Sequence, residues 1–204
     1  MLGEDRQPGE RGRRGRRISS GLALDVLSFG AMTWLPLRIG LLLLVAAAVS
    51  CRGDGGCARG SLCDCSDGDH CYLGCADGDG CDLSCHNTVE CGAVCGNDCT
   101  HTCHDTTDCT SDCGDDCQID CHTNMSCGAI CGARCQYSCA NVTNCGVRVG
   151  PGSAVSCTQV SNCQVECDGA CQVQCSGVGT CGVVCLDGTL PITCGGDVLA
   201  CGSC

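Results

Sequence analysis

Residues 103–139 read CHDTTDCTSDCGDDCQIDCHTNMSCGAICGARCQYSC, in which cysteine recurs with the spacing C-x5-C-x3-C-x3-C-x3. This block continues on both sides of the stretch. Its first cysteine returns at Cys85, Cys103, Cys121, Cys139, Cys157 and Cys175. A fixed period of this length is typical of solenoid proteins, in which each repeat forms one coil and contacts only its neighbours.

The cysteines also obey a shorter period. All 28 of them from Cys51 to Cys185 occupy odd positions. Side chains alternate between two faces of an extended chain, so these cysteines can all face inward. Links such as GAV, QID and QYS favour strands, whereas GND and GDD favour turns. The sequence therefore predicts an all-β fold, a flattened right-handed parallel β-solenoid of 18-residue coils over residues 65–185, followed by a C-terminal cap over residues 186–204.

A helical fold is the alternative, because C-x3-C also places cysteines on one face of a helix. Glycine, aspartate, asparagine and threonine fill the spaces between the cysteines. These residues are poor helix formers, and the sequence favours the solenoid.

The number of cysteines indicates how they pair. The chain has 31, an odd number, so one cysteine is left over if the rest form disulfides. The repeat register expects cysteines at Val149 and Ser153, and both are missing together. If these two positions bond to each other, their joint loss leaves no partner behind. We therefore predict bonds that span the turns within a coil. Bonds between cysteines stacked one coil apart are the alternative.

The prediction covers three groups of cysteines. Pairs across five residues are Cys57–Cys63, Cys65–Cys71, Cys75–Cys81, Cys85–Cys91, Cys103–Cys109, Cys121–Cys127, Cys139–Cys145, Cys157–Cys163 and Cys175–Cys181. Pairs across three residues are Cys95–Cys99, Cys113–Cys117, Cys131–Cys135 and Cys167–Cys171. Two further bonds among Cys185, Cys194, Cys201 and Cys204 would hold the cap.

Residues 1–50 have the composition of a leader. Ile39 to Val49 is an apolar run of eleven residues, too short to cross a bilayer but suited to a signal peptide. Met32 begins a complete signal peptide over residues 32–50 and is a possible true start. The run ends at Ala48-Val49-Ser50-Cys51, which resembles the lipobox of bacterial lipoproteins. The resemblance implies that Cys51 is acylated and anchors residues 51–64, a linker or N-terminal cap, to a membrane.

The charge of the chain excludes several classes of partner and reaction. The net charge is −12, and the chain contains no lysine. An acidic surface repels phosphate, so nucleic acid is not an expected partner. No motif marks a nucleophile beside a histidine and a carboxylate, so we do not expect an enzyme.

Four aromatic residues cannot supply a conventional core, and disulfides are expected to replace it.

Over residues 57–185 the cysteine layout resembles disulfide-reinforced β-solenoids, of which insect antifreeze proteins are one type. It is more similar to cysteine-periodic exported proteins of bacteria, whose roles are mostly unassigned. The resemblance implies the fold and export rather than an activity. Ice binding itself needs a regular threonine ladder, and Thr88 and Thr106 begin one that Asn124 ends.

Acidic residues and histidines gather in one half of the chain. His86, His104 and His122 recur at one position of the repeat and should stack as a ladder, as should Asp98 and Asp116. Imidazole suits zinc or copper, and carboxylates suit calcium. These five residues are therefore the candidate metal ligands, although a run of acids is usually a solvated face. Thiolate metal storage by the cysteines is a further alternative, which needs reduced thiols.

The function expected from the sequence is a non-catalytic, lipid-anchored protein of the cell envelope, acting as a rigid structural or interaction module. The alternatives are divalent-cation binding by residues 54–122 and thiolate metal storage. Export places the chain in the periplasm or outside the cell, and Arg52 after Cys51 favours the outer membrane or cell surface. No cofactor is expected apart from a possible calcium or zinc ion.

Overall fold

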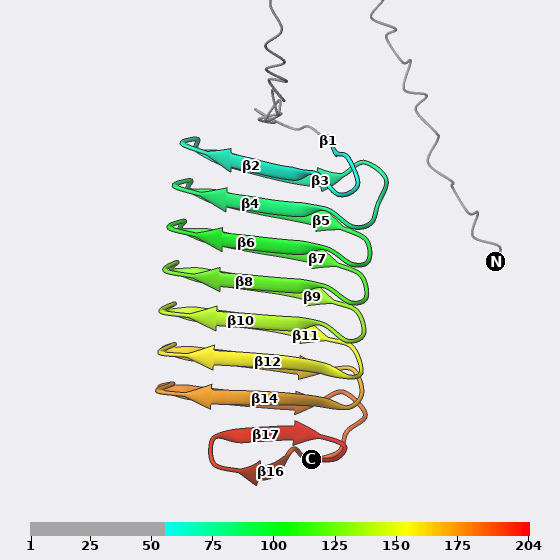
Figure 1. Ribbon diagram of the computed structural model, residues 1–204. Coiled ribbons are helices and arrows are strands. Elements are labelled where there is room, and N and C mark those ends of the chain that lie inside the picture. Colours follow the sequence, from blue (N-terminus) through cyan, green and yellow to red (C-terminus); the bar gives the residue numbers. More distant parts are fainter. Residues whose placement is uncertain (1–55) are drawn as a thin grey trace, which may run out of the picture. The chain divides into compact units, whose positions relative to one another are not determined.

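The computed structural model describes residues 56–204, so the leader, Met32 and Cys51 lie outside the described residues. Those 149 positions form an all-β structure with short parallel strands stacked in order along the chain (Figure 1). No helix of the described part is long and apolar enough to cross a membrane. The predicted β-solenoid is confirmed.

The solenoid has two sheets, and each coil contributes one strand to each sheet. The eight-stranded sheet contains β1 (Gly56–Cys57), β3 (His70–Cys75), β5 (Glu90–Cys95), β7 (Asp108–Cys113), β9 (Ser126–Cys131), β11 (Asn144–Val149), β13 (Asn162–Cys167) and β15 (Thr180–Cys185). The nine-stranded sheet contains β2 (Leu62–Ser66), β4 (Asp82–His86), β6 (Thr100–His104), β8 (Gln118–His122), β10 (Gln136–Ala140), β12 (Ser153–Thr158), β14 (Cys171–Ser176), β17 (Val198–Cys201) and β16 (Ile192–Gly195).

Strand pairing reproduces the period read from the sequence. From β4 onward each residue of a parallel strand pairs with its equivalent in the next repeat, as Tyr137 does with Val155. The preceding coil is longer by two positions, as the pairing of Leu62 with Asp82 and of His70 with Glu90 shows. The additional two positions lie in the link between Cys75 and Cys81, which is longer than the corresponding link of later coils. Within the described residues, the stacking includes β1 and β2.

The interior is narrow and filled mainly by sulfur and small apolar groups. Most of the cysteines are buried, together with residues such as Leu83, Ile119 and Val173. Successive residues of a strand alternate between buried and exposed, as in β7 and β13. This alternation follows from the pleat and confirms that the odd positions of the strands face inward.

Fifteen disulfides crosslink the described residues. Thirteen of them span a turn within one coil and join the same cysteines as the predicted pairs. Their Cα–Cα distances of 6.0–6.6 Å lie within the range of ordinary disulfides. The last two bonds, Cys185–Cys201 and Cys194–Cys204, hold the C-terminal segment. There β17 pairs antiparallel with β14 and ends the parallel stacking of that sheet.

The two positions that lack cysteine lie inside the solenoid, at the two ends of one turn. Val149 and Ser153 are both buried. Ser153 Oγ accepts a hydrogen bond from the Cys135 backbone N–H at 3.0 Å and donates one to the Gly132 carbonyl at 3.4 Å. A methyl-bearing side chain and a hydroxyl thus fill the space that a disulfide fills in the adjacent coils.

Candidate functional site

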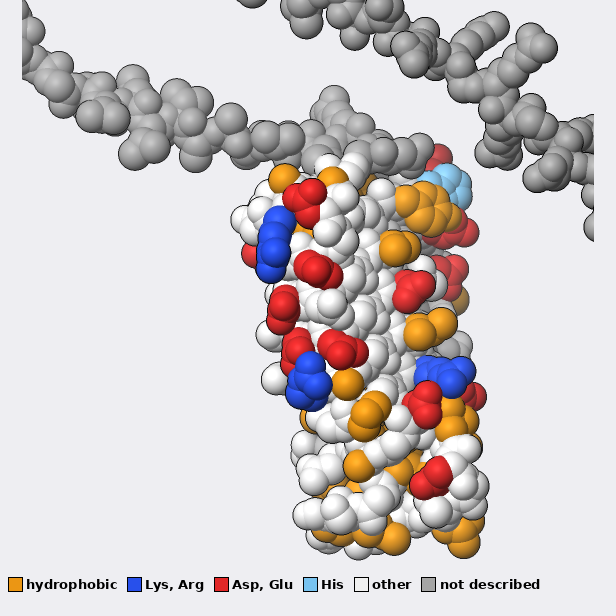
Figure 2. Space-filling view, turned by 90° about the vertical axis from the view of Figure 1, so that its right-hand side faces the viewer, with side chains coloured by type: hydrophobic (Ala, Val, Ile, Leu, Met, Phe, Trp, Pro, Cys, Tyr) orange, Lys and Arg blue, Asp and Glu red, His pale blue; other side chains and the backbone are white. Residues whose placement is uncertain are grey.

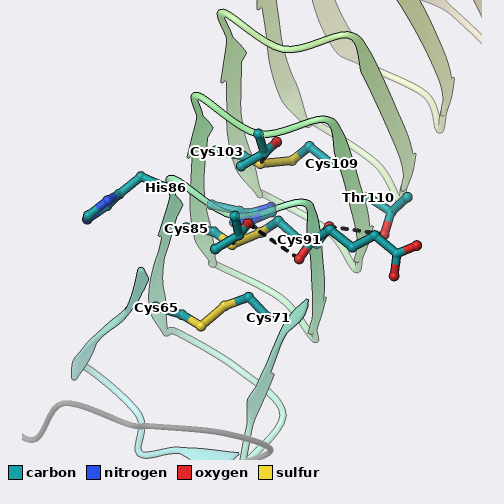
Figure 3. Close-up of a disulfide and its surroundings, with 12 residues drawn as sticks. Cys65, Cys71, Cys85, His86, Cys91, Cys103, Cys109 and Thr110 are labelled. Atoms are coloured by element: carbon teal, nitrogen blue, oxygen red, sulfur yellow. Dashed lines mark hydrogen bonds between the residues drawn. A yellow bond between two sulfur atoms is a disulfide. The ribbon is translucent and has the colours of Figure 1, made fainter. Parts of the chain in front are cut away.

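The three predicted histidines form one ladder on the outer face of the nine-stranded sheet. His86, His104 and His122 end strands β4, β6 and β8, and the parallel register places each opposite the next. Their rings are stacked, with centroids 5.2 Å and 5.1 Å apart and interplanar angles of 15° and 2°. Figure 3 shows His86 directed away from the disulfide Cys85–Cys91 and the interior. We call these residues the histidine ladder.

Each ring of the ladder is oriented by the residue that follows it. His104 Nδ1 lies 2.9 Å from Asp105 Oδ2, and His86 and His122 make the equivalent contacts to Asn87 at 3.2 Å and Thr123 at 3.3 Å. Asn87, Asp105 and Thr123 have positive φ angles of 53°, 54° and 61°. This left-handed conformation, which asparagine and aspartate adopt readily, begins the turn and is shared by all three coils.

A carboxylate from the preceding coil lies beside the first ring. His86 Nε2 is 3.3 Å from Asp64 Oδ1, and both side chains are partly exposed. The column that Asp64 begins continues with Ser84, Thr102 and Asp120. Asp120 shares strand β8 with the last histidine, and the coil after it carries alanine at the ladder position. Within the described residues, His86 is therefore the only ladder histidine whose preceding coil carries a carboxylate in this column.

Asp98 and Asp116 lie on the other edge of the flattened coil, in the turns that follow β5 and β7. A whole strand separates these turns from the histidines, or roughly 17 Å of extended chain. Asp116 forms a two-point ion pair with Arg134, whose Nε lies 2.6 Å from Asp116 Oδ1. The arginine hydrogen bond lowers the pKa of Asp116. The structure therefore does not bring these two aspartates together with the histidines in one site.

Figure 2 shows acidic side chains following this edge, with arginines among them. Some of these turn residues bind the backbone of the next coil. Asn97 N–H donates to Asp79 Oδ1 at 2.7 Å, Asp115 N–H to Asn97 Oδ1 at 2.8 Å, and Ala133 N–H to Asp115 Oδ1 at 2.8 Å. The acidic column is therefore partly structural, a role that sequence reasoning missed because it depends on the stacking of the turns.

A polar pair in the interior was also not predicted from the sequence. His101 and Ser111 are both buried, at positions equivalent to Ile119 and Ala129 of the next coil. The His101 Nδ1 and Ser111 Oγ atoms are hydrogen-bonded, and Nε2 lies 3.6 Å from Cys91 Sγ. Burial lowers the pKa of His101 to about 4, so its ring is neutral at pH 7. His101 lies one repeat before Ile119, so the period of the sequence could have identified it as an interior position.

The short threonine ladder lies inside the protein. Thr88 and Thr106 are buried, and so is Asn124 at the next step. Thr106 N–H donates to Asn124 Oδ1 at 2.7 Å, and Asn124 Nδ2 donates to the Cys103 carbonyl at 3.2 Å. These hydroxyl and amide groups serve the backbone of the turns and present no surface to ice.

The cysteines cannot serve as metal ligands in this oxidised form. Sulfur atoms lie close together in several places, such as Cys117, Cys131 and Cys135, and one such group includes His101. Every cysteine from Cys57 to Cys204 is disulfide-bonded, so none of these groups offers a thiolate. Thiolate metal storage would require reduction of the crosslinks that hold the coils.

Two open hollows of the described residues lie on the outer faces of the sheets. One, of about 290 Å³, is lined by side chains such as Gln118, Gln136, Ser138, Ala154 and Gln172. The other, of about 430 Å³, lies over glycines and small residues of the eight-stranded sheet, including Gly92, Thr110 and Gly128. Neither combines a nucleophile with a histidine and a carboxylate, the arrangement that hydrolytic chemistry uses.

No protein-family model, curated protein or solved structure matches this chain. The resemblance to exported bacterial lipoproteins therefore has no support beyond the sequence features on which it was based.

Proposed function

We propose that this protein is a non-catalytic, lipid-anchored module of the cell envelope, with a rigid solenoid presented at the outer membrane or cell surface. The abundance of disulfides indicates an oxidising compartment outside the cytosol. The apolar run Ile39–Val49 and the small residues before Cys51 support export and acylation.

The observation that carries the proposal is the cysteine count. The fifteen bonds use all thirty cysteines from Cys57 to Cys204. The chain has 31, so the remaining one is Cys51, the residue that the lipobox resemblance assigns to the lipid. A thioether to a diacylglyceryl group would occupy this sulfur and leave no reactive thiol in an oxidising compartment.

The solenoid suits a structural role. Its stacked turns fix the spacing of surface side chains along the coils, and the hollows on its sheet faces are open to solvent. Binding surfaces of solenoid proteins are built from such regular arrays. The acidic turns that carry Asp98 and Asp116 would give the anchored module a negatively charged edge.

The test is metabolic labelling of the full-length chain with palmitate, beside a Cys51→Ser variant. We expect label in the wild-type protein and none in the variant. Disulfide mapping by mass spectrometry serves as the control, because both proteins should contain the same fifteen bonds. Label that persists in the Cys51→Ser variant, or a mature wild-type chain without lipid, would refute the anchor.

A further inference from the structure

The outer face of the nine-stranded sheet is uncharged over three neighbouring strands, β10, β12 and β14 (Figure 1). The side chains that point outward from these strands end in amides, hydroxyls or methyl groups, and none carries a charge. The chain as a whole has a net charge of −12. One strand closer to the N-terminus a charge returns, at Asp120, which lies on β8 opposite Ser138. Over β10, β12 and β14, the surface therefore offers a ligand no ion pair.

A hollow lies on this face over β12 and its neighbours. Its volume is about 290 Å³, near the lower limit of small-molecule sites, and it is open to solvent, so a longer ligand can extend beyond it. Ala154 lines the hollow and pairs with Gln136 on one side and Gln172 on the other. The side chain of Ala154 is shorter than the two that flank it, which leaves space above the strand. Val198 of the cap adds a second apolar group to the lining.

The polar groups that line the hollow can both donate and accept hydrogen bonds. They are the amides of Gln118, Gln136, Gln172 and Gln174 and the hydroxyls of Ser138 and Ser156. An amide has two N–H donors and a carbonyl acceptor, and a hydroxyl has one donor and two lone pairs. None of these six side chains is hydrogen-bonded to another group among residues 56–204. Their donors and acceptors are therefore available to a ligand.

Two classes of macromolecule fit this face poorly. Protein interfaces are centred on aromatic or large aliphatic side chains, and none of the exposed large hydrophobic residues of the described chain lies on β10, β12 or β14. Nucleic acids bind through arginine and lysine, and these three strands contain neither. A neutral ligand with many hydroxyl groups fits better, because each hydroxyl can donate to an amide and accept from one. Sugars have this chemistry, and their C–H groups can pack on Ala154 and Val198.

We propose that the hollow over Ala154 binds a neutral oligosaccharide or one segment of a longer glycan. The amides of Gln136 and Gln172 hold the hydroxyls of one sugar from both sides. Because neighbouring strands lie about 4.8 Å apart, the amide of Gln118 continues the same column towards an adjoining sugar. The proposal rests on the role of interaction module and names its class of partner, whereas it is independent of a lipid at Cys51.

Nuclear magnetic resonance of the purified full-length protein tests the proposal. Cellopentaose, maltopentaose and chitopentaose are titrated separately as neutral probes. We expect at least one of them to bind saturably at millimolar concentration or below, and to shift the side-chain NH₂ signals of Gln136 and Gln172. Gln136→Ala and Gln172→Ala should each weaken binding about fivefold, the effect of losing one hydrogen bond.

Two further variants locate the ligand. Ala154→Gln gives β12 the side chain that both neighbouring strands have at this position, so it fills the hollow with little risk to the fold. It should weaken binding at least about tenfold, because the new side chain occupies the place of the sugar. Gln164→Ala is the matched control, since it removes an exposed glutamine from β13 on the other sheet. This variant should bind within about twofold of the wild type.

The outcomes are distinguishable, and unchanged disulfide maps would show that each variant has folded. If none of the three oligosaccharides bound saturably up to the highest millimolar concentrations, the proposal would be overturned. Equal losses in the Ala154→Gln and Gln164→Ala variants would overturn the location of the site. An uncharged peptide of glutamine and serine is the rival ligand, and binding of this peptide without any of the sugars would make the face a peptide site instead. Failure of palmitate labelling together with sugar binding would refute the lipid anchor alone.

Discussion

His101 shows how one residue can make the stability of the solenoid depend on pH. Its ring is buried against Ser111 and Cys91, and the burial lowers its pKa to about 4 from the ordinary 6.5. A folded-state pKa below the unfolded one means that the unfolded chain binds more protons between these two values. The free energy of unfolding therefore falls as pH drops from about 6.5 towards about 4.

A double variant tests this at the residue scale. Leu83 occupies the position of His101 in the preceding coil, and Ala93 and Ala129 occupy that of Ser111 on either side. His101→Leu/Ser111→Ala therefore copies the neighbouring coils. Between pH 7 and pH 4.5, the wild type should lose roughly 2 kcal/mol more stability than the variant. Urea unfolding of both proteins at pH 7 and pH 4.5 measures the difference. Equal losses would contradict the burial of a neutral imidazole.

Two glycines can be compared to test how closely the turns of adjacent coils stack. A Cβ at Gly114 would lie 2.9 Å from the Gly96 carbonyl oxygen and 2.5 Å from Asn97 Oδ1, whereas a Cβ at Gly146 would meet nothing within 4 Å. Gly114→Ala should destabilise the protein by about 1–3 kcal/mol, because one coil would be forced away from the next. Gly146→Ala should be neutral or slightly stabilising. Urea unfolding of the two variants checks both values, and equal effects would refute this account of the contact.

At the scale of the element, each turn is closed by a disulfide across its ends, and only the turn over residues 150–152 lacks one within the repeating part of the described chain. Val149 pairs with Cys131 and Cys167 in the sheet, and Ser153 pairs with Cys171. The equivalent cysteines of the neighbouring coils are bonded with Cα–Cα distances of 6.3 and 6.0 Å. The backbone at residues 149 and 153 should therefore accept a bond of the same kind.

We expect the Val149→Cys/Ser153→Cys variant to form a sixteenth disulfide. Mass spectrometry should show the loss of two hydrogens and no additional free thiol. Stability should rise by up to about 2 kcal/mol, offset in part by the loss of the Ser153 hydrogen bonds. The single variant Val149→Cys serves as the control and should carry one reactive thiol. A double variant with two free thiols would contradict the assumed geometry of this turn.

The strands and their crosslinks could be predicted because cysteine marks the inward face at every second position. The turns could not be predicted in the same way. Thr88 and Thr106 occupy even positions and yet are buried, because the left-handed residues Asn87 and Asp105 reverse the alternation. The metal candidates failed to form one group for a related reason. Asp98 and His104 are close in sequence, but a strand places them on opposite edges of the coil.

At the scale of the whole molecule, the described chain is a stack in which hydrogen bonds join the coils and sulfur joins the ends of every turn of the repeating part except that over residues 150–152. The thirteen turn-spanning bonds connect residues only four or six apart, so none of them ties one coil to the next. The bonds compensate for an interior that contains few large side chains. They do so by restricting the unfolded chain, which is the main way in which short crosslinked loops contribute to stability.

This arrangement decides what happens when the exposed loops are cleaved. A peptidase that cuts between Cys85 and Cys91, or in any other bonded turn, leaves both new ends attached through sulfur, and the fragments separate only after reduction. Gly150-Pro151-Gly152 is the exception among the turns of the repeating coils that the structure describes, because no bond encloses it. A cut there would divide the backbone into two polypeptides held together by strand pairing alone, so this short loop is the place where the stack can be opened without any redox chemistry.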